Sequence, residues 1–207
     1  TCKIHNLLLL THNFSFMAVI IAGERSGVGK TTVTLALLSY LSKRGLQVQS
    51  FKVGPDYIDP MFHKYVTGRA CRNLDPVLTS EDYVKKCFYK YSYLSEYTLV
   101  EGVMGLFDGV KTSSLPLSMV RRGNWNLNLT LALSLVRRGV NNFASTAHIA
   151  KLLNLPVLLV IDCSRLSGSV AAIVHGYRSF VIEVQFAGGI LNRVGSDRQL
   201  SLRINSL

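Results

Sequence analysis

The segment at residues 17–44 constrains the fold more than any other part of the sequence. An uninterrupted apolar run at 17–22 leads into a glycine-rich loop at 23–30, and a helix is predicted over 31–44. A short run without polar residues is typical of a strand buried on both faces. A glycine loop between such a strand and a helix turns backbone N–H groups and the positive end of the helix dipole toward one point, which favours phosphate binding. The segment therefore predicts a P-loop.

The loop reads Gly-Glu-Arg-Ser-Gly-Val-Gly-Lys-Thr-Thr over 23–32. Its glycines leave room for a phosphate chain, Lys30 can reach the β and γ phosphates, and the Thr31 hydroxyl can bind Mg²⁺. The pattern G-x-x-x-x-G-K-[ST] would place its first glycine at position 24, where this chain has Glu24 and the glycine is Gly23. The predicted nucleotide-binding residues of the loop are Arg25, Ser26, Gly27, Val28, Gly29, Lys30, Thr31 and Thr32.

Strand and helix patterns alternate along the rest of the chain. Further strands are predicted at 47–53, 97–100, 156–161 and 184–191, and further helices at about 81–93, 146–153 and 167–177. This alternation predicts an α/β fold, a P-loop NTPase-type parallel sheet with helices on both faces. A length of 207 residues with 48% hydrophobic content suits one such domain, which we assign to 17–207.

Two segments depart from this rhythm. Met17 suits a natural start, so we expect residues 1–16 to be an unstructured leader. The nine residues Leu115–Gly123 read LPLSMVRRG and nearly repeat as LALSLVRRG at Leu131–Gly139. Two copies are too few for a solenoid. We therefore interpret residues 113–143 as a duplicated insert, either a mobile excursion or an added hairpin, with a functional lid as the alternative.

The formal net charge of +11 is unevenly distributed. No acidic residue lies between Asp108 and Asp162, a stretch that contains Lys111, Arg121, Arg122, Arg137, Arg138 and Lys151. No nucleic-acid-binding motif accompanies these charges, so we expect no nucleic-acid partner and interpret them as serving polyanionic small molecules or as having no role. No apolar run approaches the ~20 residues of a membrane span. The four cysteines have no metal-binding spacing, which favours a reducing cytoplasm.

Two further clusters of polar residues follow predicted strands. Lys52–Pro60 reads KVGPDYIDP, and its two carboxylates, Asp56 and Asp59, can hold Mg²⁺ or position a substrate, although an ordinary Pro/Asp turn is the alternative. Val100–Gly109 reads VEGVMGLFDG, and Glu101 lies just past a strand, where a Walker-B acid holds Mg²⁺ or its water shell. The glycines after Glu101 let a bulky ligand approach the backbone, unless they form a purely structural loop.

These blocks together resemble the cobyrinic acid a,c-diamide synthases, a family of corrin-pathway amidoligases. The resemblance continues through Ser145–Leu153, Pro156–Asp162 and Leu191–Gly195, and it covers about residues 17–112 and 144–200. The loop with its glycine at 23 is also similar to that of dethiobiotin synthetases and partition ATPases. In those ATPases a lysine often stands where this chain has Arg25.

The resemblance implies an ATP-dependent amidation with Mg²⁺. ATP would phosphorylate a side-chain carboxylate of a corrinoid polycarboxylate, and ammonia would displace the phosphate. It implies catalytic roles for Lys30, Asp56, Glu101 and Asp108, and metal binding by Thr31, Asp56 and Glu101. Asn192 would lie in the base-recognising loop.

Members of this family are longer than this chain and end in a glutamine amidotransferase domain that supplies ammonia. No cysteine here lies in a Gly-x-Cys-x-Gly nucleophile elbow, so that domain is expected to be absent from these 207 residues. Without the remaining parts of the longer family members, these 207 residues are expected to retain ATP binding better than amidation. A partition or septum-site ATPase switch, a sister amidoligase such as cobyric acid or dethiobiotin synthetase, and a nucleotide-binding remnant are the alternatives. A homodimer is left open.

Overall fold

The computed structural model describes residues 17–110, 142–166 and 168–195. The leader predicted at 1–16 and nearly all of the insert predicted at 113–143 lie outside these residues. At the base of the insert, the Val110 backbone N–H donates to the Phe143 carbonyl at 2.9 Å. The chain therefore departs and returns at adjacent points.

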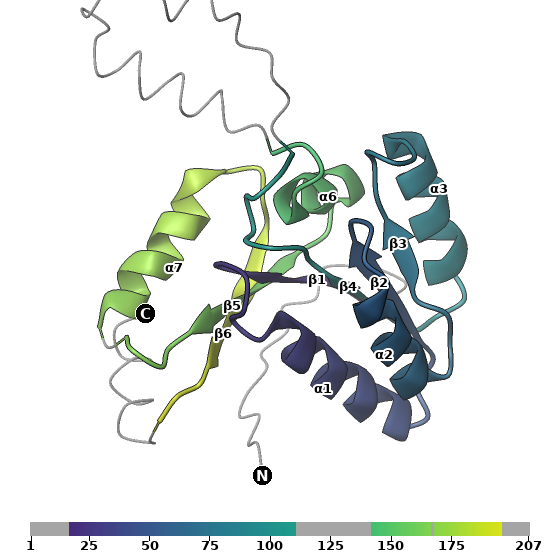
Figure 1. Cartoon of the computed structure of the whole chain (residues 1–207), viewed down its shortest axis with the longest axis horizontal. Coiled ribbons are helices and arrows are strands. Elements are labelled where there is room, and N and C mark those ends of the chain that lie inside the picture. The colour runs from purple at the N-terminus through teal and green to yellow at the C-terminus, as the bar shows by residue number, and fades with distance from the viewer. Residues whose placement is uncertain (1–16, 111–141, 167, 196–207) are drawn as a thin grey trace, which may run out of the picture.

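Six parallel strands form one sheet in the order β3-β2-β4-β1-β5-β6 (Figure 1). This confirms the predicted α/β fold with a parallel sheet. The strands are β1 (Met17–Gly23), β2 (Val48–Val53), β3 (Arg72–Leu74), β4 (Tyr97–Glu101), β5 (Val157–Asp162) and β6 (Phe186–Asn192).

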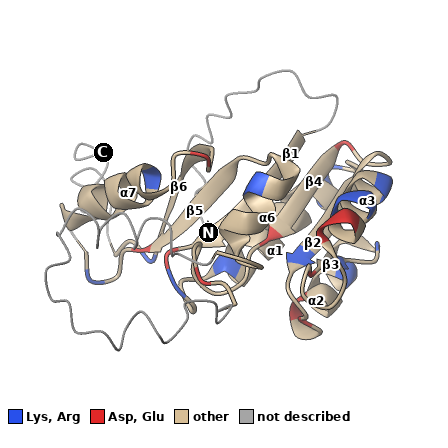
Figure 2. Cartoon of the chain, turned by 90° about the horizontal axis from the view of Figure 1, so that it is seen from above, with Lys and Arg blue, Asp and Glu red and all other residues tan. Residues whose placement is uncertain are grey.

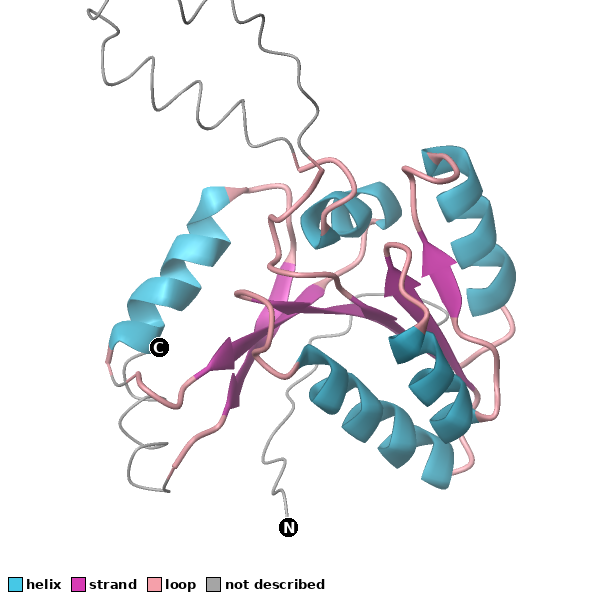
Figure 3. Cartoon of the chain, viewed as in Figure 1, coloured by secondary structure: helices cyan, strands magenta, loops and turns pink. Residues whose placement is uncertain are grey.

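Helices cover both faces of the sheet (Figure 3). Two of them, α1 (Lys30–Lys43) and α2 (Ile58–Thr67), lie on one face. The other face carries α3 (Glu81–Ser92), α6 (Thr146–Leu153) and α7 (Ser169–Phe180). No helix in the described ranges is long and apolar enough to cross a membrane.

The core is divided by the sheet. Under α3, α6 and α7, buried residues from all three helices and five strands form the larger cluster, with Phe51 and Phe88 in ring contact at 5.3 Å. Under α1, two smaller clusters are centred on Ile21 and Leu38. Burial of this apolar area supplies the main driving force for folding. Because α1 packs over β1 and β4, its first residues lie at the edge of the sheet where those strands end.

Side-chain caps begin two of the helices. The Ser80 hydroxyl accepts the N–H of Tyr83 at α3, and the Ser145 hydroxyl accepts the N–H of His148 at α6. Acidic residues occupy the first turn of α3 and a lysine its last turn, so both signs of charge appear on this helix (Figure 2). This arrangement complements the helix dipole.

The sequence reading missed α2 and β3. The turn expected at Asp56 is present, since its Oδ1 accepts the N–H groups of Ile58 and Asp59 at 2.8 and 3.2 Å, but these bonds start a helix. The apolar residues of α2 gave no inward-facing pattern because most of them are exposed, including Met61 at 71% and Tyr65 at 89%. β3 has only three residues, which is too short to show a period.

Candidate functional site

The phosphate loop connects β1 to α1, and its glycines adopt the conformations that the sequence requires of them. Gly27 and Gly29 have φ of 78° and 99°, a region that disfavours side chains with a Cβ. Gly29 precedes α1 without a side-chain cap, unlike the serines before α3 and α6. The first N–H groups of α1 are therefore left to a ligand, which is the arrangement that binds phosphate.

Lys30 lies at the start of α1 and is 8% exposed. Its ammonium donates to the Met104 carbonyl at 2.5 Å and to the Arg25 carbonyl at 3.3 Å. Burial, followed by the nearby positive charge of Lys52, lowers the pKa of Lys30 below its usual value, and the carboxylates of Glu101, Asp108 and Asp59 offset only part of this. The lysine is thus held across the loop, between the strand ends of β1 and β4.

The end of β6 supports the loop from the other side. The Asn192 side-chain amide donates to the Val28 carbonyl at 2.7 Å, and the Arg193 guanidinium donates to the Gly27 carbonyl at 3.0 Å. A Cβ added at Gly29 would lie 2.3 Å from Asn192 Nδ2. In this structure Asn192 therefore holds the loop backbone; the role in base recognition stays a prediction.

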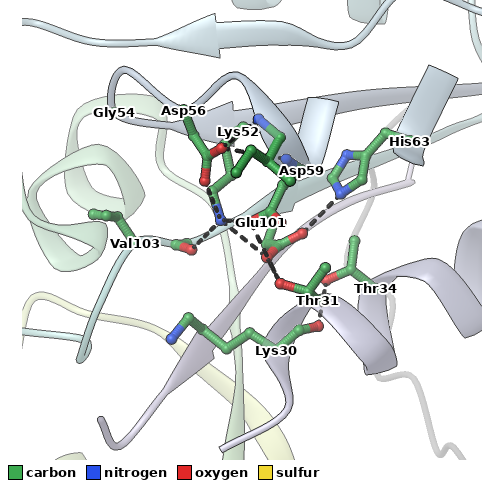
Figure 4. Close-up of polar contacts among 12 residues, drawn as sticks. Lys30, Thr31, Thr34, Lys52, Gly54, Asp56, Asp59, His63, Glu101 and Val103 are labelled. Carbon is green, nitrogen blue, oxygen red and sulfur yellow. Dashed lines mark hydrogen bonds and ion pairs between the residues drawn. The ribbon is translucent and has the colours of Figure 1, made fainter. Parts of the chain in front are cut away.

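Glu101 is fully buried at the end of β4, and both of its carboxylate oxygens are hydrogen-bonded (Figure 4). Thr31 donates its hydroxyl to Oε1 at 2.6 Å, Lys52 donates to the same oxygen at 2.9 Å, and His63 Nε2 lies 2.7 Å from Oε2. Burial raises the pKa of Glu101, but the His63 hydrogen bond, the Lys52 charge and the Thr31 hydroxyl outweigh it and bring the pKa to about 2. The carboxylate is ionised at neutral pH.

Lys52, on β2, forms ion pairs with three carboxylates. Its ammonium lies 2.5 Å from Asp59 Oδ2, 2.9 Å from Glu101 Oε1 and 3.6 Å from Asp56 Oδ2. Burial lowers the pKa of Lys52, but Glu101 and Asp59 more than compensate, so the pKa is raised. Asp56 is thus brought to the site as predicted, and Asp59 lies nearer the ammonium than Asp56 does.

Asp108 lies in the loop after β4. Its Oδ2 accepts the N–H of Gly105 at 2.8 Å, so the carboxylate closes the glycine turn. Its charge acts on Lys30, whereas the three carboxylates paired with Lys52 are those of Asp56, Asp59 and Glu101. Asp108 therefore supports the loop over the phosphate site, and its catalytic role stays a prediction.

Arg25 is 59% exposed and pairs within its own chain, with Glu24 and with Asp162 at 3.3 Å. Arg193 bonds the same Asp162 oxygen at 2.7 Å. The Ser164 amide and hydroxyl, with Arg193, bring the pKa of Asp162 to about 2 despite an opposing contribution from burial. These pairs fix the outer side of the phosphate loop.

A hollow of about 360 Å³ joins these groups at the carboxyl edge of the sheet. It combines phosphate-loop residues with the acidic residues of the two neighbouring strands, as the sequence predicted. Three residues in or beside this site had no role in that prediction: Lys52, His63 and Arg193. The first two stand in or next to the KVGPDYIDP block, so their place in the motif was the available signal. Residues from the loop and from the strand ends line the hollow, namely Ser26, Gly27, Gly29, Lys30, Thr31, Thr32, Lys52, Asp56, Asp59, Glu101, Val103, Met104 and Arg193.

These features define a P-loop nucleotide-binding domain. The sheet is parallel, a glycine loop leads into a helix without a side-chain cap, a lysine is buried at the helix start, and a threonine hydroxyl donates to a carboxylate at a strand end. The fold is shared with chloroplast FtsY from Physcomitrella patens, with a TM-score of 0.52, 17% identity, and coverage of 96% of this chain and 55% of that one. The chain belongs to the CobQ/CobB/MinD/ParA nucleotide binding domain family, whose profile matches residues 19–207.

The curated relatives with higher sequence identity are diamide synthases. The chain is 58% identical over 186 residues to a cobyrinate a,c-diamide synthase from Synechocystis sp., covering 90% of this chain and 33% of the relative. It is 49% identical to the enzyme of the same name from Gloeobacter violaceus, with coverages of 90% and 35%. A hydrogenobyrinate a,c-diamide synthase from Streptomyces coelicolor is 43% identical, with coverages of 89% and 32%. The chain spans about a third of the length of these relatives.

Proposed function

We propose that the chain binds Mg²⁺-ATP in the hollow and, as the nucleotide-binding part of a cobyrinate a,c-diamide synthase, activates side-chain carboxylates of a corrinoid for amidation. The observation that carries the proposal is the convergence of Lys30, Thr31 and Glu101 at one edge of the sheet, with the carboxylates of Asp56 and Asp59 beside them. The identity to synthases of this name supports the choice of reaction. Residues 17–207 are proposed as the ATP-binding synthase domain, with the insert at about 113–143.

The residues that line the hollow fit both the phosphate chain of ATP and Mg²⁺. Gly27 and Gly29 keep the loop open to a phosphate chain, and no side chain caps α1. The donor set for magnesium is hard oxygen, from the Thr31 hydroxyl and the Glu101 carboxylate, with Asp56 nearby. In the described ranges no group of three or more His, Cys, Asp or Glu is arranged to hold a metal. Mg²⁺ commonly takes only one or two carboxylates and completes its shell with phosphate and water, so this arrangement suits it.

The reaction needs positioning and charge stabilisation from the protein. A carboxylate oxygen of the substrate attacks the γ-phosphorus, the bond to the bridging oxygen breaks, and ADP leaves. Ammonia then attacks the acyl carbon, phosphate leaves, and loss of a proton gives the amide. Lys30 stabilises charge on the transferring group, and Lys52 carries a second positive charge at the same edge. Magnesium bound at Thr31 and Glu101 would neutralise charge on the phosphates.

Asp56 and Asp108 are proposed to handle substrate and assist catalysis, and Arg25, Ser26, Val28, Thr32 and Asn192 to contact the nucleotide. Ammonia is proposed to come from a glutamine amidotransferase domain outside these residues. A partition-type ATPase switch is not favoured, because the curated relatives cited above are named as diamide synthases, although the family description also includes MinD and ParA.

The proposal is tested with the purified 207-residue chain and its Lys30→Met variant. Titration with ATP at millimolar Mg²⁺ should show binding to the native chain and a large loss in the variant. Incubation with Mg²⁺-ATP, cobyrinic acid and ammonium chloride should release phosphate in a corrinoid-dependent way, with mass spectrometry detecting amide in place of acid. ATP hydrolysis stimulated by DNA and indifferent to the corrinoid would instead support the switch.

A further inference from the structure

The feature that carries a further inference is the contact between His63 and Glu101. His63 is the only buried residue of α2 and has no exposed surface, although large apolar neighbours on the same helix are exposed. A fully buried imidazole against a fully buried carboxylate is costly unless both are hydrogen-bonded. The 2.7 Å contact between His63 Nε2 and Glu101 Oε2 meets that need.

The direction of this hydrogen bond follows from the chemistry of the acceptor. An ionised carboxylate can only accept, so Nε2 must carry the hydrogen. The other ring nitrogen, Nδ1, lies 3.4 Å from the Cys71 sulfur. Burial raises the pKa of Cys71 to about 12, so the thiol keeps its hydrogen and can donate it to Nδ1. The ring is therefore held from both sides, with its Nε2–H directed at Glu101.

This contact fixes the orientation of the Glu101 carboxylate plane. His63 occupies Oε2, and Oε1 is left toward Thr31 and Lys52, both of which line the hollow. Without His63, the carboxylate could rotate about the last side-chain bond of Glu101, and its plane would no longer be fixed with one oxygen toward Thr31. Groups that orient a metal-binding carboxylate in this way strongly affect metal affinity.

We propose that His63, supported by the Cys71 thiol, is a positioning residue that orients Glu101 for magnesium beside Thr31. The inference rests on the proposed Mg²⁺-ATP site and adds to it two residues that do not line the hollow. His63 lies behind Glu101 rather than in the lining of the hollow, so its effect passes through Glu101.

Two amide variants separate orientation from simple filling of space. In His63→Gln the amide nitrogen can reach the position of Nε2 and still donate to Glu101. In His63→Asn the nitrogen reaches only the position of Nδ1, on the side of Cys71. Each variant of the full chain is titrated with Mg²⁺ at a fixed concentration of a fluorescent ATP analogue, and nucleotide binding without Mg²⁺ is measured in parallel. Thermal unfolding followed by circular dichroism checks that each variant is folded.

We expect His63→Asn to raise the Mg²⁺ concentration for half-maximal binding about tenfold, the usual effect of losing a residue that orients a metal ligand, and His63→Gln to stay within about threefold. Binding without Mg²⁺ should be alike in all three proteins. Equal Mg²⁺ dependence in native and folded His63→Asn chains would overturn the inference and leave the proposed function intact. Absence of Mg²⁺-dependent binding by the native chain would overturn both.

If His63→Asn does not fold, Cys71→Ala and Cys71→Ser decide the question, because they leave the His63–Glu101 contact in place. Alanine removes the donor to Nδ1, whereas serine retains an O–H. We then expect alanine to raise the half-maximal Mg²⁺ concentration about threefold and serine to restore it. Equal values for the two variants would contradict the inference.

Discussion

Lys52 and Thr31 donate to the same oxygen of Glu101, at 2.9 and 2.6 Å. One carboxylate oxygen thus accepts hydrogen bonds from a charged ammonium and from the hydroxyl that binds magnesium in P-loops. A cation entering beside Thr31 would share this oxygen with the ammonium, which has Asp59 at 2.5 Å as its second partner. The lysine can therefore remain paired when a metal is bound.

Replacement of Lys52 should destabilise the fold. Lys52→Met leaves the buried Glu101 and the partly exposed Asp59 without their nearest positive charge. Breaking a buried ion pair from one side costs about 3–5 kcal/mol, and we expect a loss at the low end because Asp59 is partly exposed. Urea unfolding measures it. Lys43→Met, at the exposed end of α1, is the matched control and should change stability little.

Magnesium should partly rescue the same variant. At millimolar Mg²⁺ without nucleotide, Lys52→Met is expected to regain stability that the native chain does not gain, because the ion can neutralise the unpaired carboxylates. A variant whose unfolding midpoint does not respond to Mg²⁺ would indicate that these carboxylates do not bind the ion.

Substitution of Gly29 should be far more damaging than substitution of Gly27. Both have positive φ, which costs a residue with a Cβ roughly 1–2 kcal/mol. Only at Gly29 would the new carbon collide with Asn192, because a Cβ at Gly27 meets nothing within 4 Å. We expect Gly29→Ala to abolish detectable ATP binding in calorimetry and Gly27→Ala to weaken it moderately. Adding Asn192→Ala should recover part of the loss in Gly29→Ala; no recovery would show that the collision is not the cause.

The stability of the chain should fall in acid partly through Glu101. Its folded pKa of about 2 lies below the ordinary 4.5, so its contribution is present above pH 4.5 and is lost as the pH falls toward 2. At ~1.4 kcal/mol per pKa unit the contribution is about 3 kcal/mol. Glu101→Gln should therefore be less stable than the native chain by about this amount at pH 7, and the gap should shrink by more than half by pH 3.

Urea unfolding at several pH values measures this gap. Asp162 also has a lowered pKa, but it is present in both proteins and cancels in the difference. Glu183→Gln serves as a control, because this side chain is 74% exposed and its ion pair with Lys151, at 3.9 Å, lies at the surface, so its gap should stay small at every pH. A gap for Glu101→Gln that stays constant down to pH 3 would contradict the assignment.

Asp59 should matter more than Asp56 for binding of Mg²⁺ with nucleotide. The Thr31 hydroxyl lies 3.4 Å from Asp59, whereas Asp56 uses one oxygen to start α2 and lies 3.6 Å from Lys52 with the other. We expect Asp59→Asn to raise the half-maximal Mg²⁺ concentration about tenfold and Asp56→Asn about threefold or less. The reverse order, measured with the fluorescent ATP analogue, would favour Asp56 as the nearer ligand, as the sequence had indicated.

Much of the fold was predictable because the chain signals it locally. The apolar runs at 17–22 and 156–161 marked β1 and β5, and the helices expected at about 81–93 and 146–153 coincide with α3 and α6 within a residue or two. α2 was missed because most of its apolar residues are exposed and its one buried residue, His63, is polar, so its pattern did not mark a face toward the core. β3 is held by three register pairs with β2, a tertiary interaction that three residues cannot reveal alone.

The candidate site was predictable where chemistry and spacing coincide. Lys30 and Thr31 follow from the loop pattern, and Glu101 follows from its place after a buried strand. Lys52 was not assigned because a lysine in a strand is ordinarily interpreted as a surface residue, and only the parallel pairing of Lys52 with Glu101 in register turns it inward. Arg193 reaches the loop from the far end of the sheet, and nothing in its own neighbourhood indicates that contact.

The link between β6 and the phosphate loop has a consequence for how this domain can be divided. Because Asn192 and Arg193 hold the carbonyls of Val28 and Gly27, a fragment ending before β6 would keep every letter of the nucleotide-binding motif and lose the struts that set its shape. Nucleotide affinity should therefore depend on whether β6 has joined the sheet. Binding at the phosphate loop, near residue 30, can be used to measure folding of the segment around residue 190.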